Sequence, residues 1–234
     1  MISLVGKNLT AGYGGVDIIK NINLEVKQGE IVVIVGPNGA GKSTAMKALL
    51  GMLKLTDGDV SFAEDDITFM LPQDRVNLGI AFVPQTQNVF TGMSVEENLE
   101  MGGFIRSDDI RLTIEDIYNL FPILREKRNQ NAGELSGGQR QQVAFGRALM
   151  TKPKILMLDE PTAGVSPIVM DELFSRIIEV GKTGVGILMV EQNAKQALNI
   201  ADRGYVLVNG MNSREGSGQD LLNNPEVRKS FLGG

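Results

Sequence analysis

The stretch that decides the fold is Glu30-Ile31-Val32-Val33-Ile34-Val35 followed by Gly36-Pro37-Asn38-Gly39-Ala40-Gly41-Lys42-Ser43. The first part is a continuous apolar run, which is typical of a strand buried on both faces. The second part fits the pattern G-x-x-x-x-G-K-[ST], whose glycines let the backbone curl around a cluster of phosphates. Residues 43–50 are predicted to form a helix, whose N-terminal end adds positive potential. We therefore predict a triphosphate site in this loop.

Each residue of the loop has an expected role. The backbone from Gly36 to Gly41 cradles the phosphates, and Lys42 offers its charge to the β- and γ-phosphates. The hydroxyl of Ser43 is expected to ligate Mg²⁺, while Thr44 reaches the α-phosphate. The competing interpretation is a glycine-rich turn that only opens a helix. The predicted loop residues are Gly36, Pro37, Asn38, Gly39, Ala40, Gly41, Lys42, Ser43 and Thr44.

A second buried strand is predicted at residues 155–158, and two acids follow it. Asp159 is expected to bind Mg²⁺, directly or through water, because Mg²⁺ keeps several waters in protein sites. Glu160 is expected near the γ-phosphate, where it would polarise the attacking water. An apolar strand that ends in two acids is a weak signal alone, often just an exposed turn. Together with the phosphate loop it indicates nucleotide hydrolysis.

Composition excludes several classes of protein. The 234 residues contain no cysteine and no histidine, which excludes disulfides, thiolate or imidazole metal sites and histidine-based triads. The net charge of −5 argues against a nucleic-acid partner, since such proteins usually carry a basic stripe. No apolar run approaches the roughly 18 residues that a membrane span needs, and the N-terminus lacks the features of a signal peptide. A cytoplasmic protein is expected.

Strands and helices alternate along most of the chain. Ile22, Leu24 and Val26 alternate with polar residues, which predicts a half-buried strand. The last third is predicted to contain helices at 166–181 and 194–201 and strands at 185–190 and 205–208, with Ser166 as a helix cap. This alternation favours an α/β fold with a parallel sheet. Residues 86–152 are predicted to be mostly helical, with caps at Ser94 and Ser136, so they form an insert in the α/β core.

Between the two phosphate-side motifs lies Leu135-Ser136-Gly137-Gly138-Gln139. A hydroxyl and two glycines at the start of a helix make a second candidate anion site. In this order, the motifs and the segment Val83-Pro84-Gln85 resemble those of the ATP-binding-cassette (ABC) ATPases over nearly the whole chain. The resemblance implies ATP and Mg²⁺ as ligands. It also implies one ABC domain over 1–234: a RecA-like core of mainly parallel sheet with an N-terminal antiparallel β subdomain (1–85 and 153–234) and a helical subdomain (86–152).

The resemblance implies further roles for single residues. Tyr13 looks like the aromatic residue that stacks on adenine, and Gln85 like the glutamine that senses Mg²⁺ and water. Glu160 would be the catalytic base. Ser136, Gly137, Gly138 and Gln139 would complete the ATP site of a second cassette, since two cassettes of this family meet head to tail. The alternatives are a strand-edge aromatic for Tyr13 and a solvated amide for Gln85.

Two positions depart from the family pattern. Gln192, within Val190-Glu191-Gln192-Asn193, stands where many ABC ATPases have a histidine. Glutamine donates a hydrogen bond to a γ-phosphate oxygen but carries no charge. Ser166 stands where the family usually ends a loop in aspartate. The strength of hydrolysis and of signalling across the dimer depends on these two changes.

The partners follow from a narrower resemblance. Residues 160–167, the segment with Gln192 and the terminal Phe231-Leu232-Gly233-Gly234 look like the smaller of two ATPases in branched-chain amino acid importers. The implied partners are a second ATPase, identical or related, two transmembrane permease subunits and, indirectly, an extracytoplasmic solute-binding protein. The chain would lie on the inner face of the membrane, and Val89, Phe90 and Met93 would contact the permease or pack inside the insert. Related urea or amide importers, a soluble ABC ATPase and a small-molecule kinase are the alternatives.

Overall fold

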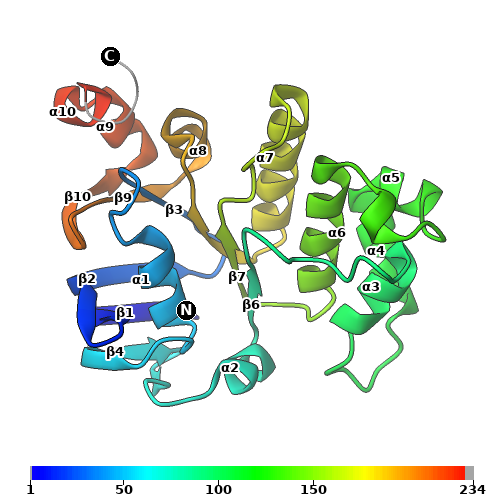
Figure 1. The fold of residues 1–234 in the computed structure, drawn as a ribbon, viewed down its shortest axis with the longest axis horizontal. Coiled ribbons are helices and arrows are strands. Elements are labelled where there is room, and N and C mark those ends of the chain that lie inside the picture. The colour runs from blue at the N-terminus through cyan, green and yellow to red at the C-terminus, as the bar shows by residue number, and fades with distance from the viewer. Residues whose placement is uncertain (1, 230–234) are drawn as a thin grey trace.

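A six-stranded sheet forms the centre of the molecule in the computed structural model, which describes residues 2–229 (Figure 1). Its strand order is β10–β9–β3–β8–β7–β6, and all neighbouring strands are parallel except the edge strand β10. The mainly parallel sheet that the alternating pattern predicted is therefore confirmed. The strands are β3 (Ile31–Val35), β6 (Ile80–Val83), β7 (Ile155–Asp159), β8 (Gly186–Val190), β9 (Arg203–Val208) and β10 (Met211–Ser217).

A smaller antiparallel sheet contains most of the N-terminal segment. Its order is β2–β1–β4–β5, with β1 (Ser3–Tyr13), β2 (Val16–Lys27), β4 (Leu55–Phe62) and β5 (Asp65–Asp66). Gly14 and Gly15 connect β1 to β2, and both have positive φ angles, as a tight two-residue hairpin turn requires. The expected antiparallel β subdomain is thus present, and Tyr13 lies at the tip of its first hairpin.

Helices cover the sheets and fill the segment between β6 and β7. Figure 1 shows α3–α6 together as a separate lobe, with α7 and α8 against the central sheet. The subdomain boundaries at residues 86 and 152 remain a prediction. The helices are α1 (Lys42–Leu49), α2 (Pro72–Leu78), α3 (Val95–Gly102), α4 (Arg111–Leu120), α5 (Pro122–Glu126), α6 (Gly137–Leu149), α7 (Pro167–Lys182), α8 (Ala194–Ile200), α9 (Gly218–Asn223) and α10 (Pro225–Val227), with a 3₁₀ turn at Ala132–Glu134.

The central sheet has a hydrophobic core on each face. Along β3, Val32 and Ile34 pack into the core shared with α1 and the small sheet, while Val33 and Val35 pack toward the helical lobe, α7 and α8. Residues of a strand point alternately to its two faces, so an uninterrupted apolar run is what a doubly covered strand needs. This double burial holds both ends of the loop that follows β3.

Helix caps set the limits of the helical lobe. Ser94 and Ser136 both cap helices, as predicted, and both form capping boxes, with Glu97 and Gln139 as the reciprocal partners. Ser166 differs: it occupies the N-cap position of α7, but its side chain accepts no capping hydrogen bond. Pro167 follows it at the first helical position and supplies the fixed φ angle with which α7 starts.

Arg75 of α2 is fully buried, which is unusual for an arginine. Its guanidinium donates to the carbonyl oxygens of Leu49, Ile67, Thr68 and Met70. The Leu49 carbonyl belongs to the last turn of α1, where carbonyls lack helical partners. Arg75 therefore ties the helix after the phosphate loop to the segment between the sheets.

We expect Arg75→Met to lower the free energy of unfolding by about 3 kcal/mol, because several buried carbonyls lose their donor. Denaturant unfolding followed by circular dichroism measures this loss. Arg111→Met is the matched control, since the side chain of Arg111 is 85% exposed and lies on the surface of α4. A value for Arg75→Met equal to that of the control would contradict a role in joining α1 to α2.

Candidate functional site

The loop between β3 and α1 is shaped by glycines that no other residue could replace without strain. A Cβ atom on Gly36 would lie 2.2 Å from the carbonyl oxygen of Leu207. Gly41 has a φ angle of 91°, and a Cβ atom there would lie 2.7 Å from the side chain of Ile19. Only glycine combines such close approach with a left-handed backbone. The loop thus curls tightly onto the N-terminus of α1, where backbone N–H groups are free to bind an anion.

Lys42 lies in the middle of this curl. Its side chain is buried, and its Nζ donates to the carbonyl oxygens of Gly36 (3.0 Å) and Pro37 (3.1 Å). Burial lowers the pKa of Lys42, while the negative charges of Glu160 and Asp159 act in the opposite direction. The amine is therefore held at the centre of the loop, close to two carboxylates.

Ser43 and Asp159 meet across 116 residues of sequence. The Ser43 hydroxyl donates to Oδ1 of Asp159 at 2.8 Å, and Asp159 is the last residue of β7. Burial raises the pKa of Asp159, although the hydrogen bond from Ser43 and the charges of Lys47 and Lys42 oppose the shift. A hydroxyl beside a carboxylate suits Mg²⁺, which binds hard oxygen ligands and takes the remainder from phosphates and water. The residues present fit that ion.

Glu160 has an unusual backbone conformation and two fixed contacts. Its φ angle is 48°, its N–H donates to the Val190 carbonyl at 2.9 Å, and its Oε2 accepts from Gln85 Nε2 at 2.8 Å. Left-handed conformations of non-glycine residues tend to occur at functional sites, where the surrounding structure fixes them. The structure thus brings together Gln85, which follows β6, and Glu160, which follows β7.

Lys42, Ser43, Gln85 and Glu160 line one cleft of about 460 Å³ outside the carboxyl ends of the parallel strands, where open α/β sheets usually bind ligands. Asp159 is not among the lining residues and reaches the cleft through its hydrogen bond with Ser43. Gln192, which follows β8, lines the same cleft. Ile18 of β2 also lines it and was missed by the sequence analysis, since an apolar strand residue carries no signal of its own. The lining residues are Ile18, Asn38, Gly39, Ala40, Gly41, Lys42, Ser43, Thr44, Gln85, Glu160 and Gln192.

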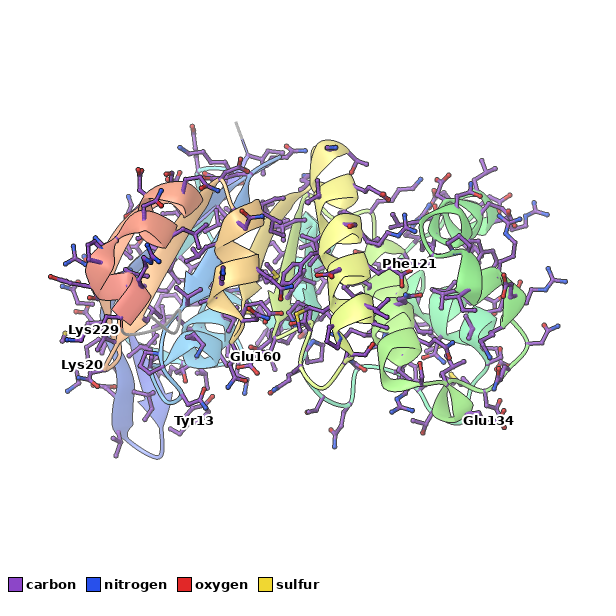
Figure 2. The ribbon with its side chains drawn as sticks, turned by 90° about the horizontal axis from the view of Figure 1, so that it is seen from above. Tyr13, Lys20, Phe121, Glu134, Glu160 and Lys229 are labelled. Atoms are coloured by element: carbon purple, nitrogen blue, oxygen red, sulfur yellow. The ribbon has the colours of Figure 1, made fainter. Side chains whose placement is uncertain are left out.

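Tyr13 does not line this cleft. It is exposed at the end of β1, beside the Gly14-Gly15 turn. In Figure 2, Tyr13 lies at the edge of the molecule, and Glu160 lies nearer its centre. The predicted adenine contact of Tyr13 therefore stays a prediction.

The segment from Ser136 to Gln139 lies at the N-terminus of α6 and outside the cleft. Ser136 and Gly137 are exposed, and the capping box joins Ser136 to Gln139 with N–O distances of 3.1 and 3.3 Å. In Figure 2, Glu134, just before this segment, lies at the periphery of the helical lobe. Ser136 and Gly137 are therefore accessible to a neighbouring molecule.

Two buried polar contacts were missed by the sequence analysis. Asn88 Nδ2 donates to Gln141 Oε1 at 2.7 Å, which joins the segment after Gln85 to α6. Glu191 accepts hydrogen bonds from both Thr162 and Gln192. The sequence did offer one signal for Glu191: it is an acidic residue that directly follows the apolar run of a buried strand.

A second groove, of about 320 Å³, lies between β6 and the helices α3 and α6. Exposed apolar side chains line it, and Phe90 stacks against the guanidinium of Arg147 at 4.8 Å. Val89, Phe90 and Met93 were expected either to contact the permease or to pack inside the insert. Val89 packs against the core and Met93 is half-buried, whereas Phe90 faces the groove. The apolar exposed residues of the groove are Phe90, Met101, Phe104 and Ile105.

Comparison with known proteins gives consistent matches. The family model described as ABC transporter matches residues 19–163. The chain is 43% identical over 223 residues to the high-affinity branched-chain amino acid transport ATP-binding protein BraG of Pseudomonas aeruginosa, covering 95% of this chain and 96% of that protein. It is 39% identical over 227 residues to the probable branched-chain amino acid transport ATP-binding protein LivF of Archaeoglobus fulgidus, covering 96% of each.

A solved structure extends the match to three dimensions. The crystal structure of MJ1267 in its ADP conformation, described as an ATP-binding cassette of an ABC transporter, superimposes with a TM-score of 0.86. The two sequences are 32% identical, and the match covers 100% of both chains. The central sheet, the small sheet and the helical lobe therefore all have counterparts in that cassette.

Proposed function

Because this chain belongs to the ABC transporter family of ATP-binding cassettes, which are ATPases, we propose that it powers an importer of branched-chain amino acids. One observation carries the catalytic part: Lys42, Ser43 and Glu160 line one cleft at the carboxyl edge of the parallel strands. The identities to BraG and LivF support the class of solute, because both proteins are described as branched-chain amino acid transport components.

Binding of ATP follows from the loop. The backbone N–H groups at the start of α1 and the amine of Lys42 bind the β- and γ-phosphates, so Lys42 exchanges its two loop carbonyls for phosphate oxygens. Ser43 and Asp159 would hold Mg²⁺, which neutralises charge on the phosphates. Gln85 has a carbonyl oxygen available for the same ion, since its amide nitrogen is the atom that contacts Glu160.

Hydrolysis follows from Glu160. Its carboxylate orients a water toward the γ-phosphate and accepts the proton, while Gln85 fixes the side chain. Gln192, which lines the same cleft, donates a hydrogen bond to a γ-phosphate oxygen. Phosphoryl transfer has a loose transition state, so positioning and charge stabilisation supply most of the rate enhancement.

A second cassette completes the site. Cassettes of this family act as dimers with transmembrane partners, and the exposed Ser136 and Gly137 support a role for this segment in the partner's ATP site. The Ser136 hydroxyl and the backbone N–H groups at the start of α6 would then donate hydrogen bonds to the γ-phosphate that the facing chain holds. The partner is a copy of this chain or a related ATPase.

The permease is the proposed occupant of the groove around Phe90. The apolar side chains of the groove lie beside the segment that begins at Gln85. The same stretch of chain therefore links ATP binding to the position of the permease. None of the helices between residues 2 and 229 has the length and hydropathy that crossing a bilayer requires. We propose that the chain attaches to the inner face of the membrane through the permease and touches no nucleic acid, and that a solute-binding protein delivers the solute outside.

Uptake and co-purification test this function together. With the chain as bait, solubilised membranes are expected to yield two permease subunits, and loss of the chain is expected to abolish uptake of labelled leucine, isoleucine and valine. Phe104→Ser should weaken co-purification, whereas Leu112→Ser, at a comparably exposed leucine on α4, should leave it unchanged. Loss of urea or amide uptake instead would identify a related importer, and recovery with ribosomes or DNA would contradict a transport role.

A further inference from the structure

Glu191 is a buried carboxylate to which the mechanism above assigns no task. It directly follows β8, is 2% exposed, and forms no ion pair with any lysine or arginine of residues 2–229. Burial raises its pKa, and hydrogen bonds from Thr162, Asn193 and Gln192 act in the opposite direction. A carboxylate is costly to bury unless hydrogen bonds satisfy it. The contacts of Glu191 therefore indicate what the side chain does.

Those contacts divide between the two oxygens. Oε1 accepts from the backbone N–H of Thr162 at 3.0 Å and from the Thr162 hydroxyl at 2.8 Å. Oε2 accepts from the backbone N–H of Gln192 at 3.1 Å. One side chain thus joins the loop after Glu160 to Gln192, which lines the same cleft.

The join lies directly beyond the end of a paired sheet. Asp159 and Val190 are the last residues of β7 and β8 to pair, and the N–H of Glu160 still reaches the Val190 carbonyl. Past this point β7 and β8 no longer pair with each other, although the N–H of Glu191 still donates to the Ile34 carbonyl of β3 at 3.3 Å. The Glu191 side chain supplies the next connection between the two segments. It therefore fixes the separation of Glu160 and Gln192 where the backbone ladder no longer does.

The left-handed conformation of Glu160 needs such support. A non-glycine residue keeps a positive φ angle only where neighbouring contacts fix it. The Val190 carbonyl holds the residue at its own N–H, and the bonds from Thr162 to Glu191 hold the chain two residues later. A glutamate suits this position because both of its oxygens accept, and every group that faces them is a donor.

We propose that Glu191 is a positioning residue for ATP hydrolysis, which holds Gln192 and the loop after Glu160 as one unit facing the same γ-phosphate. The proposal rests on the ATPase function proposed above and adds a residue to its machinery. Glu191 does not line the cleft, so it acts through Gln192 and Glu160 rather than on ATP.

Glu191→Gln tests the proposal with little change in size. The amide oxygen can still accept from Thr162, but the amide nitrogen then meets the N–H of Gln192, donor against donor. We expect kcat to fall by about 10- to 100-fold, because small misplacements of catalytic groups have effects of this size. The Kd for ATP, measured by equilibrium binding, should change by less than about 3-fold, since the phosphate loop is unaffected.

A comparison of double variants separates positioning from a general loss of structure. Gln192→Ala should lower kcat in the wild-type chain but add little in the Glu191→Gln chain, because Gln192 is already displaced there. Thr162→Val should lower kcat as well, and its combination with Glu191→Gln should be no worse than the stronger single variant. If the reductions in kcat of the single variants multiply in both double variants, the proposal is overturned.

Controls keep the result interpretable. Thr113→Val makes the same change as Thr162→Val at another buried threonine, far along the chain in α4, and should leave kcat unchanged. If Glu191→Gln fails to fold, Thr162→Val and its combination with Gln192→Ala test the same contact. If the wild-type chain hydrolyses ATP and the Glu191→Gln chain is equally active, the positioning role of Glu191 is overturned and the proposed ATPase function stands. A wild-type chain without ATPase activity would overturn the proposed function, and this proposal with it.

Discussion

Glu160→Gln is expected to lower ATP turnover by about 100- to 1,000-fold while leaving ATP binding intact. The amide keeps the size of the side chain but cannot accept a proton from water. The contact with Gln85 is also altered, because Gln85 Nε2 donates to a carboxylate oxygen in the wild-type chain. ATP would then remain bound, and the closed dimer would accumulate.

Phosphate release and equilibrium nucleotide binding measure the two parts of this prediction. Glu126→Gln serves as the control, since Glu126 is exposed on α5 in the helical lobe. Turnover in the Glu160→Gln chain within about 3-fold of the wild type would exclude Glu160 as the base, because a general base contributes far more than that.

Lys42→Ala should weaken ATP binding by about 100-fold. The amine is buried inside the loop and held by two loop carbonyls, so it is already positioned for the β- and γ-phosphates. Charge-assisted hydrogen bonds to phosphate are among the strongest that a protein forms, and alanine removes them. Binding of a fluorescent ATP analogue, with ATP as the competitor, measures the loss.

Lys182→Ala is the matched control for this variant, because Lys182 is exposed at the end of α7. The control should bind ATP like the wild type. Unchanged ATP affinity in the Lys42→Ala chain would contradict the assignment of residues 36–44 as the phosphate loop, whatever the effect on turnover.

The parts of the site that lie within one short segment could be predicted from the sequence. The loop from Gly36 to Ser43 encodes its own curl, since a Cβ atom would clash at Gly36 and Gly41, and Gly39 has a positive φ angle. The capping box at Ser136 is likewise local, because Gln139 lies only one helical turn away. The alternation of apolar Ile22, Leu24 and Val26 with polar residues is also a local pattern, and it predicted β2. The three side chains are buried in the structure.

Contacts between distant segments could not be predicted from local pattern. Gln85 and Glu160 are 75 residues apart, and only the pairing of β6 with β7 brings them together. Residues 51–82 carry no secondary-structure prediction; within them β4 includes Gly58, where a Cβ atom would lie 2.4 Å from the Lys7 carbonyl oxygen of β1. The burial of Arg75 depends on four carbonyls that no sequence pattern indicates.

One local expectation, the helix cap at Ser166, is confirmed in its position but not by a side-chain bond, and another falls on terminal residues. Ser166 occupies the N-cap position of α7 with Pro167 at the first helical position, but its hydroxyl makes no capping bond. The terminal segment from Phe231 to Gly234, which contributed to the resemblance, lies outside the described residues.

The most direct measurement is release of phosphate from ATP labelled at the γ-position, with the full chain, its membrane partners and no phosphate acceptor. The central claim is that this cleft hydrolyses ATP with Ser43, Asp159 and Glu160 around the γ-phosphate. We expect one free phosphate for each ADP formed, and no release when a chelator removes Mg²⁺ or when Glu160→Gln replaces the base. Label transferred to another molecule, or release that persists in the Glu160→Gln chain, would contradict the account.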